Sequence, residues 1–154
     1  MNTPYFQSSP RQTELHAICA AWGGTPFVPS SQIKGAGGGV DCARFVYAVL
    51  HEAGAVAVYD FSAERYAILG DGPANLAIIT RIVTALGLEP TTEPLLPGDV
   101  LVFTRRARNH MAVATGGEKI WHVIKGPGVI ESRLKELQIL GDLVATYRAM
   151  EVTP

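Results

Sequence analysis

Three residues of this chain have the types and the order that nucleophilic chemistry requires, namely Cys42, His110 and His122. Cys42 ends the glycine-rich run GAGGGVDC and begins the apolar-periodic segment CARFVYAVLHEAG. A cysteine at the start of a helix becomes a strong nucleophile when a histidine exchanges a proton with it and a further polar group orients that histidine. These residues therefore indicate attack by the Cys42 thiol on a carbonyl carbon, with His110 moving the proton and His122 orienting His110.

The start of a helix alone does not account for a reactive thiolate. A cysteine thiol has an ordinary pKa of about 8.5, and each unit by which that pKa is lowered requires about 1.4 kcal/mol. A helix N-terminus supplies roughly 0.3–1 kcal/mol when it is exposed and up to ~2 kcal/mol when it is partly buried. Because the charge of Asp41 opposes the thiolate, we predict an ion pair between the Cys42 thiolate and a protonated His110 ring.

The segment that carries Cys42 has the pattern of a helix over residues 42–53. Its apolar residues recur at offsets of 0, 3, 4, 7, 8 and 11 from Cys42, which is the buried stripe of an amphipathic helix. Asp41 is a suitable N-cap for the N–H of Arg44, and Gly54 is a suitable C-terminal stop. Similar patterns predict helices over residues 11–22 and about 73–86, with a Gly/Pro/Ser-rich loop over 23–40.

From Asp99 onwards the pattern changes to short β-rich runs separated by turn residues. The runs are VLVFT, HMAVAT, KIWHVI and VIESRL. Helices followed by antiparallel strands predict an α+β fold in which the helix that begins at Cys42 packs on the sheet. His110 and His122 share one face of this sheet only if the turn after Thr115 has three residues, pairing Thr115 with Lys119, or contains an equivalent bulge.

The motifs, taken in order, resemble those of the NlpC-type family of papain-like cysteine peptidases, which are bacterial cell-wall enzymes. The similarity runs from about residue 22 to residue 134. The matching segments are the small-x-Pro-aromatic motif Gly24-Thr25-Pro26-Phe27, the nucleophile motif Val40-Asp41-Cys42-Ala43 and the strand opening Leu96-Pro97-Gly98-Asp99-Val100. The chain departs from the family pattern in having Ala43-Arg44 where a Ser-Gly pair is commoner, and in a long insert over residues 59–92.

The resemblance implies a papain-like fold and hydrolysis of an amide bond in the peptide stem of peptidoglycan. The implied reaction is that of a γ-D-glutamyl-diamino acid endopeptidase, with a thioester on Cys42 as the intermediate. It also implies that Asp41 meets an amine of the substrate. Arg44, Arg108 and Phe27 complete the candidate substrate-binding residues, since Arg108 belongs to an arginine-rich run just before His110 that could bind carboxylates.

Other interpretations of the same residues stay open. Taken singly, Cys42 could be a small buried residue and His122 a core histidine beside Trp121. One cysteine and two histidines are also accepted zinc ligands, but no C-x-x-C or H-x-x-x-H spacing is present, so we expect neither a metal nor another cofactor. A non-catalytic module of the same fold, and an amidase or acyltransferase that acts on a non-wall substrate, are the remaining alternatives.

The composition suits one soluble domain over residues 1–154. Thirteen basic against fourteen acidic side chains produce no strong overall field, so we expect neither a nucleic acid nor a membrane as partner. The second cysteine, Cys19, lies with Leu15, Ile18 and Trp22 on an apolar helical stripe and is expected in the core.

The N-terminal residues MNTPYFQSSPRQTEL lack the charged start and apolar stretch of a secretory signal. We therefore expect a cytoplasmic protein, whose access to a cell wall would require delivery in a phage particle or non-classical export. The stretch from Trp22 to Cys42 resembles phage-tail-associated members of the family, which agrees with the first of these routes.

Overall fold

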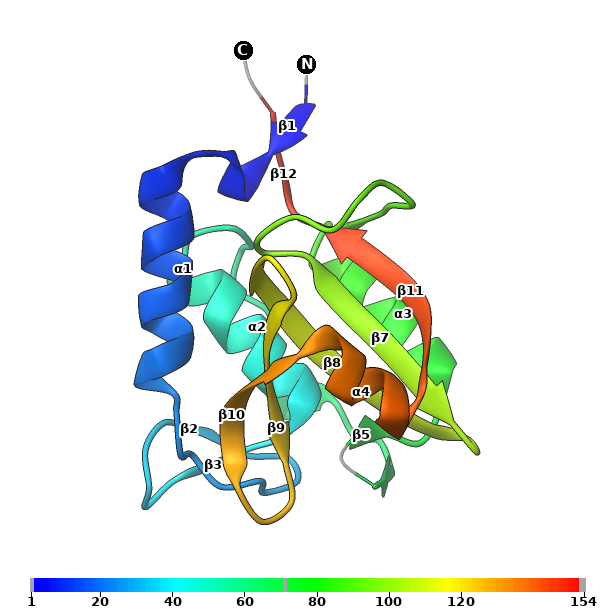
Figure 1. The fold of residues 1–154 in the computed structure, drawn as a ribbon. Coiled ribbons are helices and arrows are strands. Elements are labelled where there is room, and N and C mark those ends of the chain that lie inside the picture. The colour runs from blue at the N-terminus through cyan, green and yellow to red at the C-terminus, as the bar shows by residue number, and fades with distance from the viewer. Residues whose placement is uncertain (1, 71, 153–154) are drawn as a thin grey trace.

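The computed structural model describes residues 2–70 and 72–152. Its centre is a twisted antiparallel sheet with helices on both faces (Figure 1). Six strands are hydrogen-bonded in the order β10-β9-β8-β7-β11-β6. Their bounds are β6 Glu89–Pro90, β7 Val100–Arg105, β8 Arg108–Gly116, β9 Lys119–Ile124, β10 Gly128–Arg133 and β11 Asp142–Arg148.

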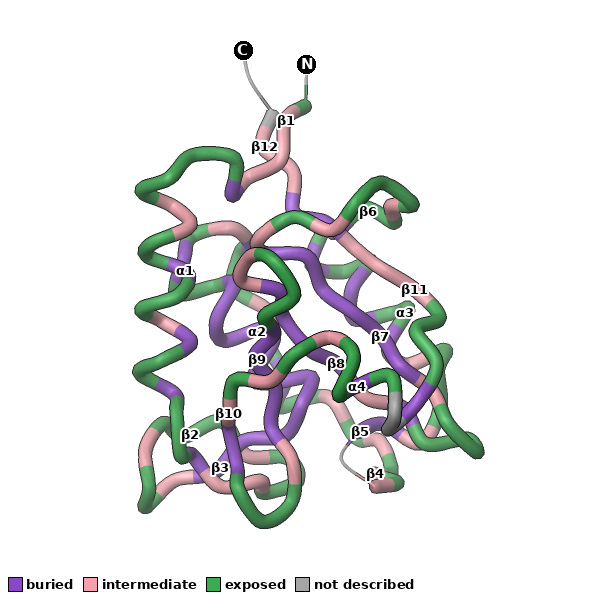
Figure 2. Tube along the Cα trace, viewed as in Figure 1, coloured by how far each residue is buried: buried purple, intermediate pink, exposed green. Residues whose placement is uncertain are grey.

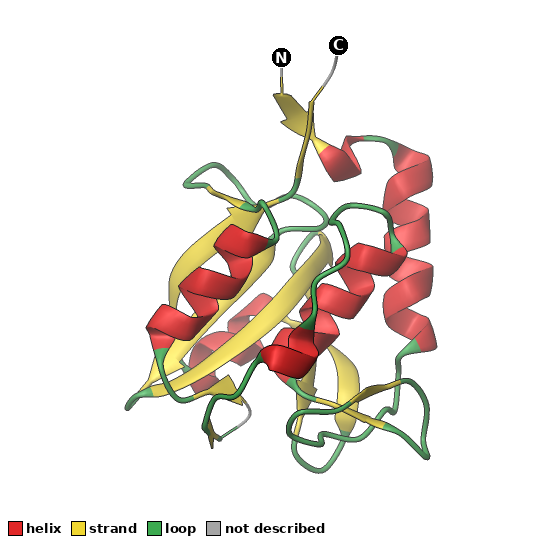
Figure 3. Ribbon diagram, turned by 180° about the vertical axis from the view of Figure 1, so that it is seen from behind, coloured by secondary structure: helices red, strands yellow, loops and turns green. Residues whose placement is uncertain are grey.

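The α-helices are distributed over the two faces of this sheet. Seen from behind, helices α2 and α3 lie in front of the strands, while α4 lies on the far side (Figure 3). Their bounds are α1 Ser9–Ala21, α2 Cys42–Glu52, α3 Leu76–Ala85 and α4 Leu134–Leu140, with short 3-10 helices at η1 Tyr5–Gln7 and η2 Phe61–Ala63. The α+β class predicted from the sequence is therefore confirmed.

Three small antiparallel ladders lie outside the main sheet. One of them joins the two ends of the described chain, a second lies in the loop before Cys42, and a third lies in the insert. Their strands are β1 Asn2–Pro4 with β12 Met150–Val152, β2 Gln32–Ile33 with β3 Gly39–Val40, and β4 Ile68–Leu69 with β5 Gly72–Pro73.

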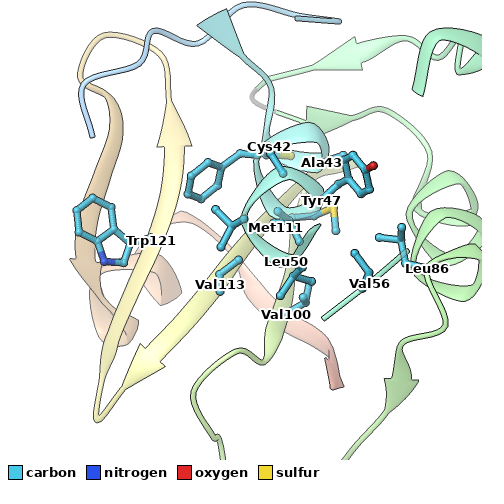
Figure 4. Packing of buried hydrophobic residues seen from close by; sticks show 14 of the residues in the cluster. Cys42, Ala43, Tyr47, Leu50, Val56, Leu86, Val100, Met111, Val113 and Trp121 are labelled. Atoms are coloured by element: carbon cyan, nitrogen blue, oxygen red, sulfur yellow. The ribbon is translucent and has the colours of Figure 1, made fainter. Parts of the chain in front are cut away.

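Helix α2 forms where the apolar periodicity predicts it. The Asp41 carboxylate accepts the Arg44 backbone N–H at 3.0 Å and so caps the helix. At the other end Gly54 takes a φ of 77°, a left-handed conformation that ends the helix without a Cβ clash. Figure 4 shows Cys42 at the start of this helix and Leu50 further along it, in one packed cluster with Val113 of the sheet.

The sheet separates two hydrophobic clusters, and the alternation of side chains along each strand decides which cluster a residue joins. Val100, Val102, Met111 and Val113 pack toward α2, whereas Leu101, Phe103, Ala112 and Ala114 pack toward α4. The buried stretches of the tube in Figure 2 follow α2 and the central strands. The start of α2 is therefore held rigidly against one face of the sheet.

The β8–β9 hairpin contains a β-bulge at Thr115. The pairs on either side of this residue are Val113 with Trp121, Ala114 with Ile120, and Gly116 with Lys119. Gly116 and Gly117 have φ values of 132° and 60°, which glycine adopts without a steric penalty. A bulge was one of the two predicted solutions and is confirmed. The pairing of Thr115 with Lys119 was wrong, because the glycine at 116 extends the strand by one residue.

The bulge decides which side chains share a face. With Val113 opposite Trp121, Ala112 falls opposite His122, so His110 and His122 become diagonal neighbours on one face. Trp121 points to the other face and packs in the α2-side cluster, as the register argument predicted.

The Pro-Gly-Asp motif fixes the start of β7 to the end of the chain. Asp99 is fully buried and accepts two hydrogen bonds of 2.8 Å from the Arg148 guanidinium, which also donates to the Pro94 carbonyl. The neighbouring Gly98 has a φ of 86°, and a Cβ there would lie 2.0 Å from the Phe6 ring. The motif therefore has a structural role here, since it holds the first central strand in place.

Two parts of the fold differ from the sequence-based expectation. Helix α3 begins at Leu76 rather than near Pro73, because Asn75 caps it by accepting the Ala77 N–H at 2.8 Å. Helix α4 and strand β11 were not predicted, and the last strand run ends at Arg133, where α4 begins. Strand β11 completes the sheet beside β7.

Candidate active site

His110, His122 and Ser132 form a continuous chain of hydrogen-bonding groups across β8, β9 and β10. His110 Nε2 lies 2.8 Å from His122 Nδ1, and His122 Nε2 lies 2.9 Å from Ser132 Oγ. The two rings are nearly perpendicular, at 79°, and His122 is 1% exposed. Because each partner comes from a different strand of one sheet, the rings are held in a fixed orientation.

The contacts restrict where the protons can be. If His110 Nε2–H donates to His122 Nδ1, then His122 Nε2–H donates to Ser132 Oγ, and Nδ1 of His110 is left as an acceptor. The described residues offer that buried Nδ1 no hydrogen-bond partner. This arrangement also persists when Nδ1 gains a proton, since Nε2–H remains in place. In this tautomer Nδ1 of His110 is available to take up a proton.

The surroundings of His110 favour its neutral form. Burial lowers the pKa of His110 to about 4, compared with an ordinary value of 6.5. Burial thus opposes the imidazolium that the sequence-based argument invoked. At neutral pH the geometry instead suits a neutral ring, which accepts a proton as the thiol attacks.

Cys42 lies at the start of α2, beside the strand end that carries His110. A Cβ added to Gly72 of β5 would lie 2.9 Å from Cys42 Sγ and 2.1 Å from the carbonyl oxygen of Asn109. The Asn109 side chain also donates to the Pro73 carbonyl at 2.9 Å. The thiol and the residue before His110 therefore contact the same glycine, and the insert strand covers the thiol, which is 0% exposed.

Asp41 and Arg44 form a buried ion pair beside the nucleophile. Arg44 Nη1 lies 2.7 Å from Asp41 Oδ2, and their side chains are 5% and 0% exposed. The same oxygen accepts the Ser30 N–H at 2.9 Å, while Oδ1 accepts the Arg44 N–H. Arg44 therefore occupies the position beside the Asp41 carboxylate that the resemblance assigned to a substrate amine.

Arg44 also attaches the insert to the nucleophile helix. Its guanidinium donates to the Phe61 carbonyl at 3.1 Å and to the Tyr66 hydroxyl at 3.0 Å, and it lies 5.0 Å from the centroid of the Phe61 ring. Burial and the charge of Asp41 raise the pKa of Tyr66, so its hydroxyl stays protonated. The sequence differs from the NlpC-type pattern at Arg44 and in the insert. These two features are in direct contact, because Arg44 donates hydrogen bonds to the insert residues Phe61 and Tyr66.

The other predicted site residues lie around this centre. Phe27 bridges to Val40 just before the nucleophile, and its ring lies 5.7 Å from the ammonium nitrogen of Lys125. Arg108 is exposed at the start of β8, with its side chain against Gly70 of the insert. Cys19 is buried in the core as predicted, and burial raises the pKa of its thiol.

Ser132 is the member of the site that the sequence did not reveal. It lies on β10, whose pairing with β9 brings Ser132 opposite Ile120 and diagonal to His122. A serine in a β-rich run has no distinctive spacing, so only the strand register could have identified it.

Two properties of the described residues bear on other functions. Within residues 2–70 and 72–152, no group of three or more His, Cys, Asp and Glu side chains is arranged to hold a metal ion. The helices of this part of the chain are all too short or too polar to cross a bilayer.

Similarity to known proteins is found in the structure and not in the sequence. No protein-family profile and no curated protein matches the sequence. A Staphylococcus aureus protein of the NLP/P60 family, described as similar to a lipoprotein, superposes with a TM-score of 0.66 at 15% identity, over 97% of this chain and 45% of that one. The NlpC/P60 domain of the peptidoglycan hydrolase SagA superposes with a TM-score of 0.53 at 17% identity, over 90% of this chain and 97% of that domain.

The chain therefore has the fold of NlpC/P60 domains, as the motif order predicted. It spans less than half the length of the staphylococcal protein.

Proposed function

We propose that this protein is a cysteine peptidase that hydrolyses an amide bond in the peptide stem of bacterial peptidoglycan. The observation that carries the proposal is the relay from Ser132 through His122 to His110, which leaves a buried acceptor on His110. The neighbouring Asn109 and the Cys42 thiol at the first position of α2 both lie against Gly72. The fold is shared with the NlpC/P60 domain of a peptidoglycan hydrolase, and this supports the substrate class.

The reaction begins with attack of Cys42 Sγ on the substrate carbonyl carbon while Nδ1 of His110 takes the thiol proton. The backbone N–H of Cys42 has no intrahelical acceptor at the first position of α2, so it can donate to the oxyanion. His110 then gives the proton to the leaving amine, which produces a thioester on Cys42. Water, deprotonated by the same Nδ1, hydrolyses the thioester and regenerates the thiol.

His122 and Ser132 act through His110 and touch no reacting atom. They hold its ring by the Nε2 hydrogen bond and fix the tautomer that leaves Nδ1 basic. The Asp41–Arg44 pair positions the start of α2 and contributes no net charge beside the thiol. Since Gly72 lies against Cys42, a substrate carbonyl reaches Sγ only when the β4–β5 hairpin moves away from it.

Digestion of purified muropeptides, with product identification by mass spectrometry, tests the proposal. We expect cleavage within the peptide stem at the γ-D-glutamyl-diamino acid bond, its loss in Cys42→Ala, and its retention in the matched variant Cys19→Ala. Activity that survives EDTA argues against a zinc module. Absence of turnover with every muropeptide would instead favour a non-catalytic module, or an enzyme for a non-wall amide or acyl group.

Delivery in a phage particle or by non-classical export is a separate hypothesis. It rests only on the resemblance of the stretch from Trp22 to Cys42, and it concerns how a wall enzyme would meet its substrate rather than what it does.

A further inference from the structure

A cavity of about 520 Å³ adjoins His110 on the α4 side of the sheet. The insert hairpin forms one wall through Leu69 and Gly70, the β7–β8 turn forms another, and Leu137 of α4 closes a third side. This volume lies within the range of small-molecule sites, which is roughly 300–1,000 Å³. The site is thus large enough for a substituent of a peptide substrate.

Three arginines line this cavity, at positions 105, 106 and 108. In the described part of the chain, the side chains of Arg106 and Arg108 make no ion pair or hydrogen bond. The nearest acidic residue on the adjoining strand is Asp142, which pairs with Thr104 in the backbone ladder but is exposed and does not line the cavity. Among the described residues that line the cavity, none is acidic, so this part of the lining presents positive charge.

The turn that carries the arginines has an unfavourable backbone. Arg106 and Ala107 have φ values of 51° and 64°, and they connect the last pair of the β7–β8 ladder, Arg105 with Arg108. Such two-residue turns favour Asn-Gly or Asp-Gly, because both positions need a positive φ. Strained conformations of this kind are concentrated at binding sites. Here the strained position itself carries one of the guanidinium groups.

The insert hairpin connects the cavity with the nucleophile. A Cβ on Gly70 would lie 3.3 Å from the Arg108 side chain, while a Cβ on Gly72 would lie 2.9 Å from Cys42 Sγ. These glycines are two positions apart, so they are separated by at most about 7 Å along the backbone. His110 lines the cavity as well. The hairpin therefore contacts both the Arg108 side chain and the thiol, and a peptide that displaces it from Cys42 can extend to the arginines.

We propose that the cavity between the β4–β5 hairpin and the β7–β8 turn is a subsite that binds a carboxylate of the peptide substrate through Arg106 and Arg108. The proposal rests on the function proposed above and adds a determinant of specificity to it. A guanidinium matches the planar carboxylate group with two parallel hydrogen bonds. The subsite therefore selects acidic stem peptides over peptides whose carboxylates are amidated.

The test compares a muropeptide with the same peptide after amidation of its free carboxylates. Hydrolysis is measured with the wild-type protein, with Arg106→Ala/Arg108→Ala, and with the control Arg65→Ala/Lys135→Ala, which removes two exposed cations that do not line the cavity. We expect the cavity variant to lower kcat/KM for the acidic peptide roughly 10- to 100-fold, mainly through KM. The control variant should cleave the acidic peptide with nearly the wild-type kcat/KM. The cavity variant should change kcat/KM for the amidated peptide little.

Calorimetric binding to Cys42→Ala protein separates this inference from the proposed function. Arginine-dependent binding of the acidic peptide by this protein would support the subsite even if the wild type cleaved nothing. Equal hydrolysis or binding of acidic and amidated peptides would overturn the subsite while leaving the peptidase intact. Displacement of the peptide by inorganic phosphate of similar affinity would also overturn it, because the cavity would then be a general anion site.

Discussion

In the proposed reaction His110 is the residue that moves the proton, and its two ring nitrogens have opposite surroundings. Nε2 is held by His122, while Nδ1 is buried and lacks a partner among the described residues. A buried acceptor without a partner is costly to the fold and is seldom retained without a role. The relay that ends at Ser132 gives this acceptor a defined orientation and a defined tautomer.

Replacing Ser132 with alanine tests the relay. Ser132→Ala removes the acceptor for His122 Nε2–H, so the tautomer that leaves His110 Nδ1 basic is no longer favoured. We expect kcat on muropeptides to fall roughly 5- to 20-fold with KM nearly unchanged, which corresponds to about 1–2 kcal/mol. Ser132→Thr keeps the hydroxyl and should restore most of the rate. Equal kcat values for all three proteins would show that Ser132 is only a packing residue.

The insert over residues 59–92 contacts helix α2 at two places. Arg44 binds Phe61 and Tyr66 near the start of the insert, and Gly72 of β5 lies against Cys42. The described part of this segment therefore contacts both the Asp41–Arg44 ion pair and the thiol.

Removing the Arg44 side chain should strongly destabilise the fold. Arg44→Ala leaves the fully buried Asp41 carboxylate without its cation, which typically costs about 3–5 kcal/mol of unfolding free energy. Arg65→Ala, which changes an exposed arginine of the same insert, should change stability by less than about 0.5 kcal/mol. Urea denaturation measures both values. Similar losses in the two variants would contradict the role assigned to the ion pair.

Adding one methyl group at Gly72 should expose the nucleophile. The Gly72→Ala Cβ would lie 2.1 Å from the Asn109 carbonyl oxygen, so the hairpin must shift away from Cys42. Overpacking of this kind costs about 1–3 kcal/mol, which increases the open population roughly 5- to 150-fold. Iodoacetamide labelling of Cys42, followed by peptide mapping, should accelerate accordingly.

The matched control for this change is Gly37→Ala, because a Cβ at position 37 has no atom within 4 Å. Its labelling rate should equal that of the wild type. If Gly72→Ala labels no faster than this control, the hairpin does not restrict access to the thiol.

Over the whole molecule, the parts that follow from local patterns could be predicted from the sequence. Helix α2 and its Asp41 cap follow from periodicity and capping, and the common face of His110 and His122 follows from counting residues around a turn. The order of the motifs predicted the NlpC/P60 fold, which the comparisons confirm.

The parts that could not be predicted depend on contacts between distant segments. Ser132 joins the site only through the β9–β10 register, and Arg44 meets Phe61 only after the insert folds back onto α2. Burial of His110, which lowers its pKa, likewise depends on how the surrounding elements pack. No spacing rule contains this information, so the sequence could not indicate that burial disfavours the protonated His110 of the predicted ion pair.

Acid should destabilise the molecule through His110. In the unfolded chain this histidine takes up a proton as the pH falls through about 6.5, whereas in the folded protein the pKa is lowered to about 4. Between these values the unfolded state binds more protons, so the free energy of unfolding falls as the pH falls. Urea denaturation between pH 7 and pH 4 should show a smaller decrease for His110→Gln than for the wild type. His51→Gln, at an exposed position of α2, should follow the wild type, and parallel curves for all three would refute the assignment.

Trapping the covalent intermediate tests the central claim most directly. The protein is mixed with an equimolar muropeptide, quenched with acid after a short reaction, and analysed by intact-protein and peptide mass spectrometry. We predict an added mass equal to the acyl part of the cleaved peptide, located on the fragment that contains Cys42 and absent from Cys42→Ala. Hydrolysis that proceeds in Cys42→Ala, or an adduct on any other residue, would contradict the assignment of Cys42 as the nucleophile.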